Sequence, residues 1–213
     1  LREAMHRQAN LLLTHHPLLM RGVHELGQET IKGNLVSAAI RSDLAIFAAH
    51  TNADLAEVGT AKALAELFGL ESVTALDALS GHGLVGVLAK PETLLAFSTR
   101  LAKLLPSVAA GIKVAGDPEA LVSKVAVAPG AGDSFLQAAR DADVDVFITS
   151  DLRHHPAQDF LEANQIGPQV ALIDISHWAA ESIWLPLAQK TLSERHPNVE
   201  FIISDIKTDP WDF

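Results

Sequence analysis

The sequence predicts an α/β protein with a largely parallel sheet, built from two related halves. Three observations predict this fold class. Short apolar segments alternate with Ala- and Leu-rich segments along the chain, which is the pattern of strands followed by helices. Two pairs of segments resemble each other across the chain. Polar clusters rich in histidine directly follow several of the apolar segments, as expected where strand ends gather around a ligand.

Strands are expected where short apolar segments are bounded by polar residues or turn residues. These segments are residues 10–14, 44–49, 73–76, 84–89, 111–114, 122–128, 144–149, 170–175 and 199–204. Helices are expected in the segments between them, at residues 31–41, 57–68, 92–105, 136–141, 157–164 and 179–192. Gly69 is expected to end the second helix, and Pro91 to open the third, because proline suits the first helical position.

The two halves of the chain carry similar short sequences. NLLLTHHP at residues 10–17 resembles VFITSDLRHHP at residues 146–156. IFAAHTNAD at residues 46–54 resembles ALIDISHWAAE at residues 171–181. We therefore predict a first α/β half at residues 1–113 and a second at 114–213. The chain begins at Leu1 in a segment typical of the middle of a helix, so we expect further residues to precede it.

The composition excludes several classes of protein. Of 213 residues, 48% are apolar and 20% are charged, which excludes intrinsic disorder. The formal net charge of −10 argues against a broad basic face, so a nucleic acid is not expected as a partner. The absence of cysteine excludes disulfides and thiolate ligands and fits a reducing, cytoplasmic location. No apolar segment approaches the roughly 20 residues that cross a bilayer, so no membrane partner is expected.

The first polar cluster is Thr14–Pro17, which follows the strand at residues 10–14. Adjacent residues of a strand point to opposite faces, so His15 and His16 can share a site only if the strand has ended. Pro17 favours that ending because it cannot donate to a strand ladder. The alternative is a pair of ordinary polar loop residues.

Two further clusters carry an acid close to a histidine. His50 and Asp54 follow the strand at residues 44–49, although Asp54 could instead cap the next helix. His177 and Glu181 are four residues apart in a predicted helix, so they share one face. This spacing could offer a nitrogen and a carboxylate to one metal ion, and the alternative is an ordinary surface pair.

The remaining clusters have more open interpretations. In residues 149–155, Asp151 could cap a helix, while His154 or His155 could orient a metal ligand or face a substrate. In residues 129–134, the Gly-x-Gly sequence could bind an anion through backbone N–H groups or form a plain turn.

Taken together, the clusters predict a metal centre with nitrogen and oxygen ligands. The candidate ligands are His15, His16, Asp54, His177 and Glu181. Five ligands are too many for one tetrahedral ion that keeps an open position, and they suit two bridged divalent ions. This donor set accepts Zn, Mn, Fe, Co or Ni, so the sequence does not identify the metal.

The ordered motifs THHPL, HTNAD, TSDLRHH and DISHWAAE resemble those of a dinuclear-metal family, the GTP cyclohydrolase type-two homologues, or proteins like the NGG-one interacting factor three. The resemblance covers almost the whole chain and implies metal ligands at the same five positions. Ser176 stands where family members usually have glycine. The resemblance also implies two intertwined α/β halves around a metal cleft, a further N-terminal helix and strand, and a ring-shaped homohexamer.

These observations lead to a functional hypothesis with two alternatives. The hypothesis is a metal-dependent hydrolase with two divalent ions per chain, acting on a nucleotide-like or phosphorylated small molecule. His154, His155 or His50 would move protons, because an unperturbed histidine titrates near neutral pH. One alternative is a metal-dependent binding or regulatory protein without catalytic turnover. The other is a plain α/β domain whose polar strand ends are helix caps and surface residues.

Overall fold

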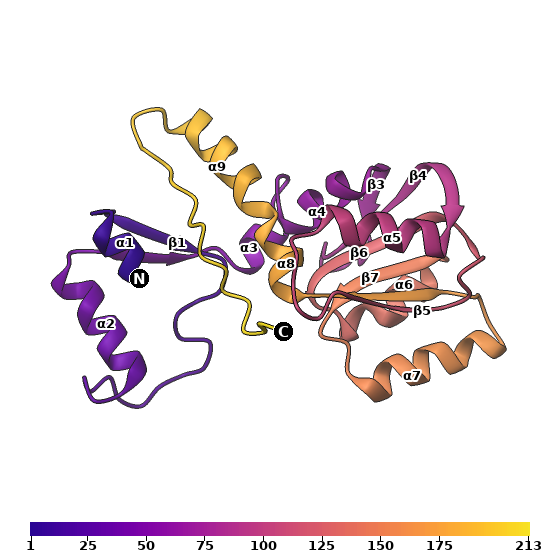
Figure 1. The fold of residues 1–213 in the computed structure, drawn as a ribbon, viewed down its shortest axis with the longest axis horizontal. Helices are drawn as coiled ribbons and strands as arrows, with labels where there is room; N and C mark the ends of the chain where they lie inside the picture. Colours follow the sequence, from indigo (N-terminus) through magenta and orange to yellow (C-terminus); the bar gives the residue numbers. More distant parts are fainter. The chain divides into compact units, whose positions relative to one another are not determined.

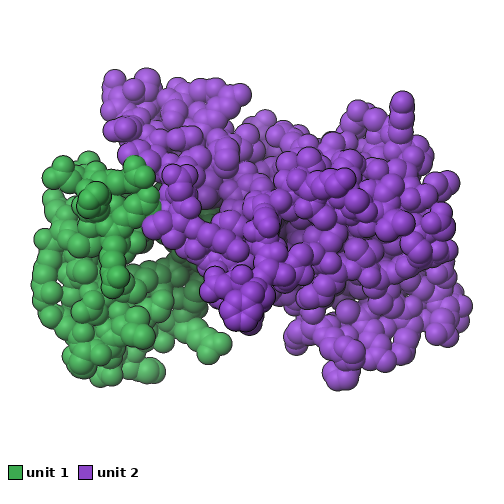
Figure 2. Space-filling view, viewed as in Figure 1, with its two compact units in different colours: residues 1–53 green, residues 54–213 purple.

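The computed structural model describes residues 1–213 and contains two compact units (Figure 2). The first unit is Leu1–Ala53 and the second is Asp54–Phe213. The predicted division into a first α/β half at residues 1–113 and a second at residues 114–213 stays a prediction. None of the helices reaches the length and apolar character that crossing a membrane would need.

The first unit is built around two parallel strands. Its elements are α1 (Arg2–His6), β1 (Leu11–Thr14), α2 (Ile31–Arg41) and β2 (Ala45–Ala48), followed at the boundary by α3 (Thr51–Asp54). Leu11 lies opposite Ala45 and Thr14 lies opposite Ala48, so the two strands end at the same edge. The helix predicted at residues 31–41 is confirmed. Its first turn is capped by Thr30, whose Oγ1 accepts a hydrogen bond of 3.0 Å from the Gly33 amide.

The second unit contains a mixed six-stranded sheet with the order β3-β4-β6-β7-β8-β5. Its strands are β3 (Leu70–Ala75), β4 (Leu84–Thr93), β5 (Ile112–Ala115), β6 (Leu121–Ala131), β7 (Val146–Ser150) and β8 (Ala171–Ile175). The three strands β6, β7 and β8 are parallel, while the other pairings are antiparallel. The α/β class is therefore confirmed, with a mixed sheet.

Helices cover both faces of this sheet (Figure 1). They are α4 (Thr60–Phe68), α5 (Leu94–Leu104), α6 (Leu136–Asp141), α7 (His154–Glu162) and α8 (His177–Ser182), with 3-10 turns at Asp133–Phe135 and Ala163–Gln165. The last helix, α9 (Trp184–Arg195), packs against α4 and α8. One apolar core joins α4, α5 and α8 to the sheet, and a second joins α6 and α7. In β7, Val146 and Ile148 belong to the first core and Phe147 to the second, so this strand is buried on both faces.

Two helices begin later in the chain than predicted, and the helix predicted from residue 157 begins earlier, at His154. The helix expected from residue 57 begins at Thr60, with Gly59 as its N-cap residue. The helix expected from residue 92 begins at Leu94, because β4 continues through Thr93, which pairs with Leu121. Pro91 is accommodated in that strand at a register shift, where the ladder needs no N–H donor.

The C-terminal prediction also needs correction. The single helix expected at residues 179–192 is two helices, α8 and α9, separated at Ile183. Pro186 has no N–H to donate to the Ser182 carbonyl, which explains why a continuous helix is not maintained there. The strand expected at residues 199–204 does not form. The Phe201 carbonyl instead accepts a hydrogen bond of 2.6 Å from the Gln189 side chain.

Candidate metal centre

The strand ends of the first unit bring three histidines together. His15 and His16 directly follow β1, and His50 follows β2 by one further residue. Because Thr14 pairs with Ala48, His16 and His50 each lie two residues beyond the last paired position. Nitrogen atoms of the three imidazoles lie within 4.8 Å of one another. The predicted convergence of His15 and His16 is therefore present within this unit.

The His15 ring is oriented by the backbone. Its Nδ1 lies 2.8 Å from the Ala49 carbonyl oxygen. Because a carbonyl oxygen only accepts hydrogen bonds, Nδ1 carries the proton in this contact, and Nε2 is the nitrogen with the lone pair in the neutral tautomer. The hydrogen bond thus fixes the orientation of the His15 ring.

In the second unit, His177 and Glu181 lie on one face of α8. The helix begins at His177, and the Ser176 hydroxyl accepts a hydrogen bond of 3.3 Å from the Ala179 amide as its N-cap. His177 Nε2 lies 2.9 Å from Glu181 Oε1, which is the contact that the four-residue spacing predicts. Serine at position 176 therefore caps the helix that carries both candidate ligands.

Asp151 holds the other nitrogen of His177. Ser150 and Ile175 are opposite each other in the parallel pair β7 and β8, so the residues that follow these strands lie close together. His177 Nδ1 donates to Asp151 Oδ2 at 2.7 Å. Asp151 adopts a left-handed backbone conformation, with φ of 55°. It does not cap α7, whose N-cap is Arg153, so the capping alternative is wrong and Asp151 positions His177 instead.

The two carboxylates raise the pKa of His177 to about 9. The largest cause is the hydrogen bond with Glu181, which outweighs the opposing effect of burial, and Asp151 adds to the shift. The metal-free protein therefore carries a protonated His177 at neutral pH. A metal ion that bound His177 through Nε2 would displace that proton, because only the neutral imidazole is a ligand.

Two glycines make room for this arrangement. A Cβ on Gly130 would lie 2.9 Å from Glu181 Oε1 and 3.7 Å from His177 Nε2, and its φ of 79° is unfavourable for other residues. A Cβ on Gly132 would overlap the Thr149 side chain. The Gly132 amide donates to the Ser150 carbonyl at 3.2 Å and is not available for an anion. Close packing of Gly130 against α8 and of Gly132 against β7 accounts for the two glycines of the Gly-x-Gly sequence.

The remaining candidate residues are Asp54, His154 and His155. Asp54 ends α3, and its Oδ1 accepts a hydrogen bond of 2.6 Å from the fully buried Thr60. Asp54 is not the N-cap of α4, so that alternative is wrong.

His154 and His155 begin α7 and are exposed, with ring centroids 5.1 Å apart. The sequence suggests that His154 or His155 orients a metal ligand, whereas in the structure Asp151 orients His177. The sequence feature that indicates this role for Asp151 is its position directly after β7, the strand that pairs with β8.

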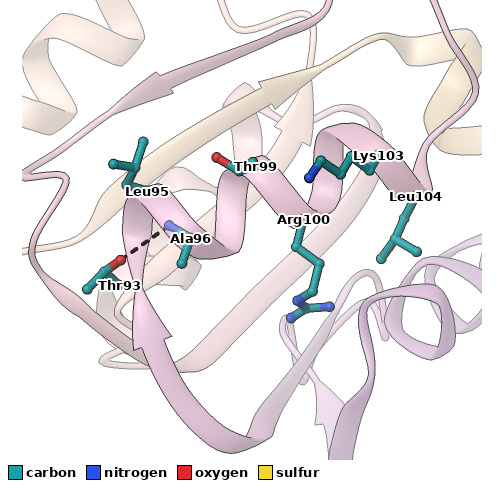
Figure 3. A pocket seen from close by; sticks show the side chains of 7 residues that line it. All are labelled: Thr93, Leu95, Ala96, Thr99, Arg100, Lys103 and Leu104. Atoms are coloured by element: carbon teal, nitrogen blue, oxygen red, sulfur yellow. Dashed lines mark hydrogen bonds between the residues drawn. The ribbon is translucent and has the colours of Figure 1, made fainter.

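A groove runs along the outer face of α5 (Figure 3). It is lined by Thr93, Leu95, Ala96, Thr99, Arg100, Lys103 and Leu104. Arg100 is paired with Glu92, and Thr93 accepts a hydrogen bond of 3.2 Å from the Ala96 amide. These side chains include no imidazole or carboxylate, so the groove offers no donor set for a metal ion.

Replacing Asp151 with asparagine is expected to lower the pKa of His177 from about 9 towards the ordinary value of 6.5. The amide removes a negative charge and a strong acceptor from Nδ1. Histidine proton resonances followed against pH in the metal-free protein measure this change. In the native protein, protonated His177 contributes stability that is fully present below about pH 6.5 and is lost as the pH rises through about 9. An unchanged midpoint in the variant would contradict the assigned contact.

Comparisons with known proteins agree with the motifs. The chain is 43% identical to the GTP cyclohydrolase 1 type 2 homolog of Streptomyces coelicolor, over 98% of this chain and 76% of that protein. It is 31% identical to the protein of the same name from Mycobacterium tuberculosis, over 96% of this chain and 82% of that one. The fold resembles that of a Bacillus cereus protein related to NIF3, with a TM-score of 0.88 and 21% identity over 100% of this chain and 85% of that one. Residues 1–210 match the profile that defines Duf34/NIF3 (NGG1p interacting factor 3), and the chain therefore belongs to this family.

Proposed function

We propose that the protein binds two divalent metal ions and hydrolyses a nucleotide-like or phosphorylated small molecule. The proposed ligands are His15, His16, Asp54, His177 and Glu181. The observation that carries the proposal is the pair His177 and Glu181, whose facing atoms are 2.9 Å apart while Asp151 holds the far nitrogen. A carboxylate–histidine pair of this kind is typical of metal sites.

The residues fit a divalent transition metal. Nitrogen and carboxylate oxygen donors without thiolates suit Zn, Mn, Fe, Co or Ni. His15 and His177 each have Nδ1 fixed by an acceptor, which leaves Nε2 as the ligand atom. Bound ions would supply Lewis-acid catalysis and activate water. The chain's own residues orient the donors, and Gly130 keeps the space beside Glu181 open.

Several finer parts of the function belong to the same proposal. His154 and His155 would transfer protons, because both are exposed at the start of α7. The relatives are named after a GTP cyclohydrolase, and this name supports testing nucleotides as substrates. A cytoplasmic homohexamer is proposed from the family resemblance. Analytical ultracentrifugation would measure the number of chains in the assembly.

The experiment combines metal analysis with an activity panel. We expect two ions per chain after purification without chelators, and hydrolysis of at least one phosphoester or nucleotide by protein loaded with Mn²⁺ or Zn²⁺. The His177→Ala variant is expected to lose both one ion and the activity, while Asp205→Ala, at an exposed position, serves as the matched control. Fewer than one ion per chain would overturn the metal centre. Full loading with a blank panel would overturn the hydrolase and favour a binding or regulatory protein.

A further inference from the structure

The C-terminal segment contains a buried carboxylate that the proposed ligand set does not use. Residues 197–213 form no helix or strand, yet Asp209 in this segment is only 8% exposed. It is the only charged residue among the buried polar side chains of the protein. Burying a carboxylate is costly unless hydrogen bonds compensate for the lost water. The partners of Asp209 therefore indicate what this residue does.

Asp209 holds the residue that caps α8. Its Oδ2 accepts a hydrogen bond of 3.1 Å from the Ser176 hydroxyl, while its Oδ1 accepts one of 3.3 Å from the nearby Trp211 amide. A hydroxyl has a single proton, so donation to Asp209 leaves the Ser176 oxygen to accept from the Ala179 amide at 3.3 Å. Asp209 thus fixes the rotation of the capping hydroxyl.

The same segment makes a second contact on the other side of His177. Lys207 Nζ lies 6.0 Å from the centroid of the Trp178 ring, a distance at which a cation attracts an aromatic face. Ser176 and Trp178 are the residues directly before and after His177. Figure 1 shows the segment returning from the end of α9 to α8. Both neighbours of His177 are therefore held from one piece of chain.

A short helix needs such support. The six residues of α8 are too few for a helix that is stable by itself, and helix ends fray. His177 is the first residue of α8, and Glu181 lies one turn further on. The positions of both side chains consequently depend on how the first turn is held. A metal site needs donors whose positions are fixed by surrounding contacts.

We propose that residues 207–211 form a strap that positions His177, and that Asp209 is its positioning residue and acts through Ser176. The inference rests on the proposed function for the role of His177 as a metal ligand, whereas the contacts of the strap do not depend on that role. Ser176 stands where family members usually have glycine. Glycine has no hydroxyl to donate to Asp209, so this connection depends on the serine of this chain.

Amide hydrogen exchange, followed by NMR on the metal-free full chain, tests the effect on α8. Asp209→Ala is expected to raise the exchange rates of the Ala179 and Ala180 amides by about 5-fold, the effect of losing a helix cap. Amides of β7 are expected to keep their wild-type rates. Asp212→Ala is the matched control, because it removes an exposed carboxylate from the same segment. Faster exchange throughout the protein would show a general loss of stability and would overturn the positioning role.

Titration with Co²⁺, followed by visible absorption, tests the effect on the metal centre. Asp209→Ala and Ser176→Ala are each expected to weaken one ion by about 10-fold and to change its absorption, because indirect partners of ligands alter affinity by this amount. The double variant is expected to bind no more weakly than either single variant, since both residues act through one connection. Effects that multiply in the double variant would show that Asp209 does not act through Ser176.

The outcomes separate the strap from the proposed function. If Asp209→Ala keeps wild-type exchange in α8 and wild-type Co²⁺ binding, the strap does not position His177 and only this inference fails. If the wild-type protein binds no Co²⁺, the proposed metal-binding function fails, and the exchange rates alone decide whether Asp209 holds α8. If Asp209→Ala loses its circular dichroism signal, Ser176→Ala decides the same question, because it removes one hydroxyl and no buried charge.

Discussion

Replacing Glu181 with glutamine is expected to lower the affinity for one divalent ion by at least about 100-fold. The carboxylate is only 11% exposed, and its Oε1 lies 2.9 Å from His177 Nε2. A neutral amide cannot neutralise a cation at this position. Residues that merely orient metal ligands already change affinity by about 10- to 100-fold, so the loss of a ligand is expected to exceed that range. Isothermal titration with Zn²⁺ or Mn²⁺ measures the change.

The matched control is Glu194→Gln, which makes the same chemical change at an exposed position on α9. This variant is expected to bind metal like the wild type. Circular dichroism and a thermal melt would confirm that both variants fold. Equal metal affinities in the two variants would remove Glu181 from the metal centre, whatever the total number of ions.

Replacing Gly132 with alanine is expected to lower the free energy of unfolding by about 2–3 kcal/mol, the usual effect of inserting an atom into a tightly packed core. The new Cβ would lie 2.6 Å from the Thr149 Cβ and closer still to the Thr149 hydroxyl. Thr149 is fully buried in the central strand β7, and its hydroxyl donates to the Gly130 carbonyl at 3.1 Å. Relief of the overlap therefore requires movement of β7 or of the end of β6. Urea denaturation followed by circular dichroism measures the loss.

Gly22→Ala provides the comparison for this experiment. No atom lies within 4 Å of a Cβ built at Gly22, so this substitution is expected to change stability by less than about 0.5 kcal/mol. Similar unfolding midpoints for the two variants would show that Gly132 is not needed for close packing. In that case the alternative interpretation of Gly-x-Gly as an ordinary turn would be favoured.

Local sequence patterns predicted some elements well and failed where longer-range pairing decided the outcome. The helix at residues 31–41 was predicted with its observed bounds, because a capping threonine and a local helical pattern are sufficient signals. The start of α5 was misplaced because β4 pairs with β6 up to Thr93, which a local pattern does not reveal. The segment at residues 199–204 has the composition of a strand but pairs with no neighbouring strand in the structure.

The same distinction applies to the candidate site. The spacing of His177 and Glu181 by itself determined that they share a helix face, because the helical repeat places residues four apart beside each other. The ordered motifs likewise determined the family. Only the tertiary structure decided that Asp151 holds His177 and that the Ala49 carbonyl holds His15, since these partners are 26 and 34 residues apart along the chain. Such contacts depend on which strands become neighbours, and strand order is set by the packing of the whole sheet.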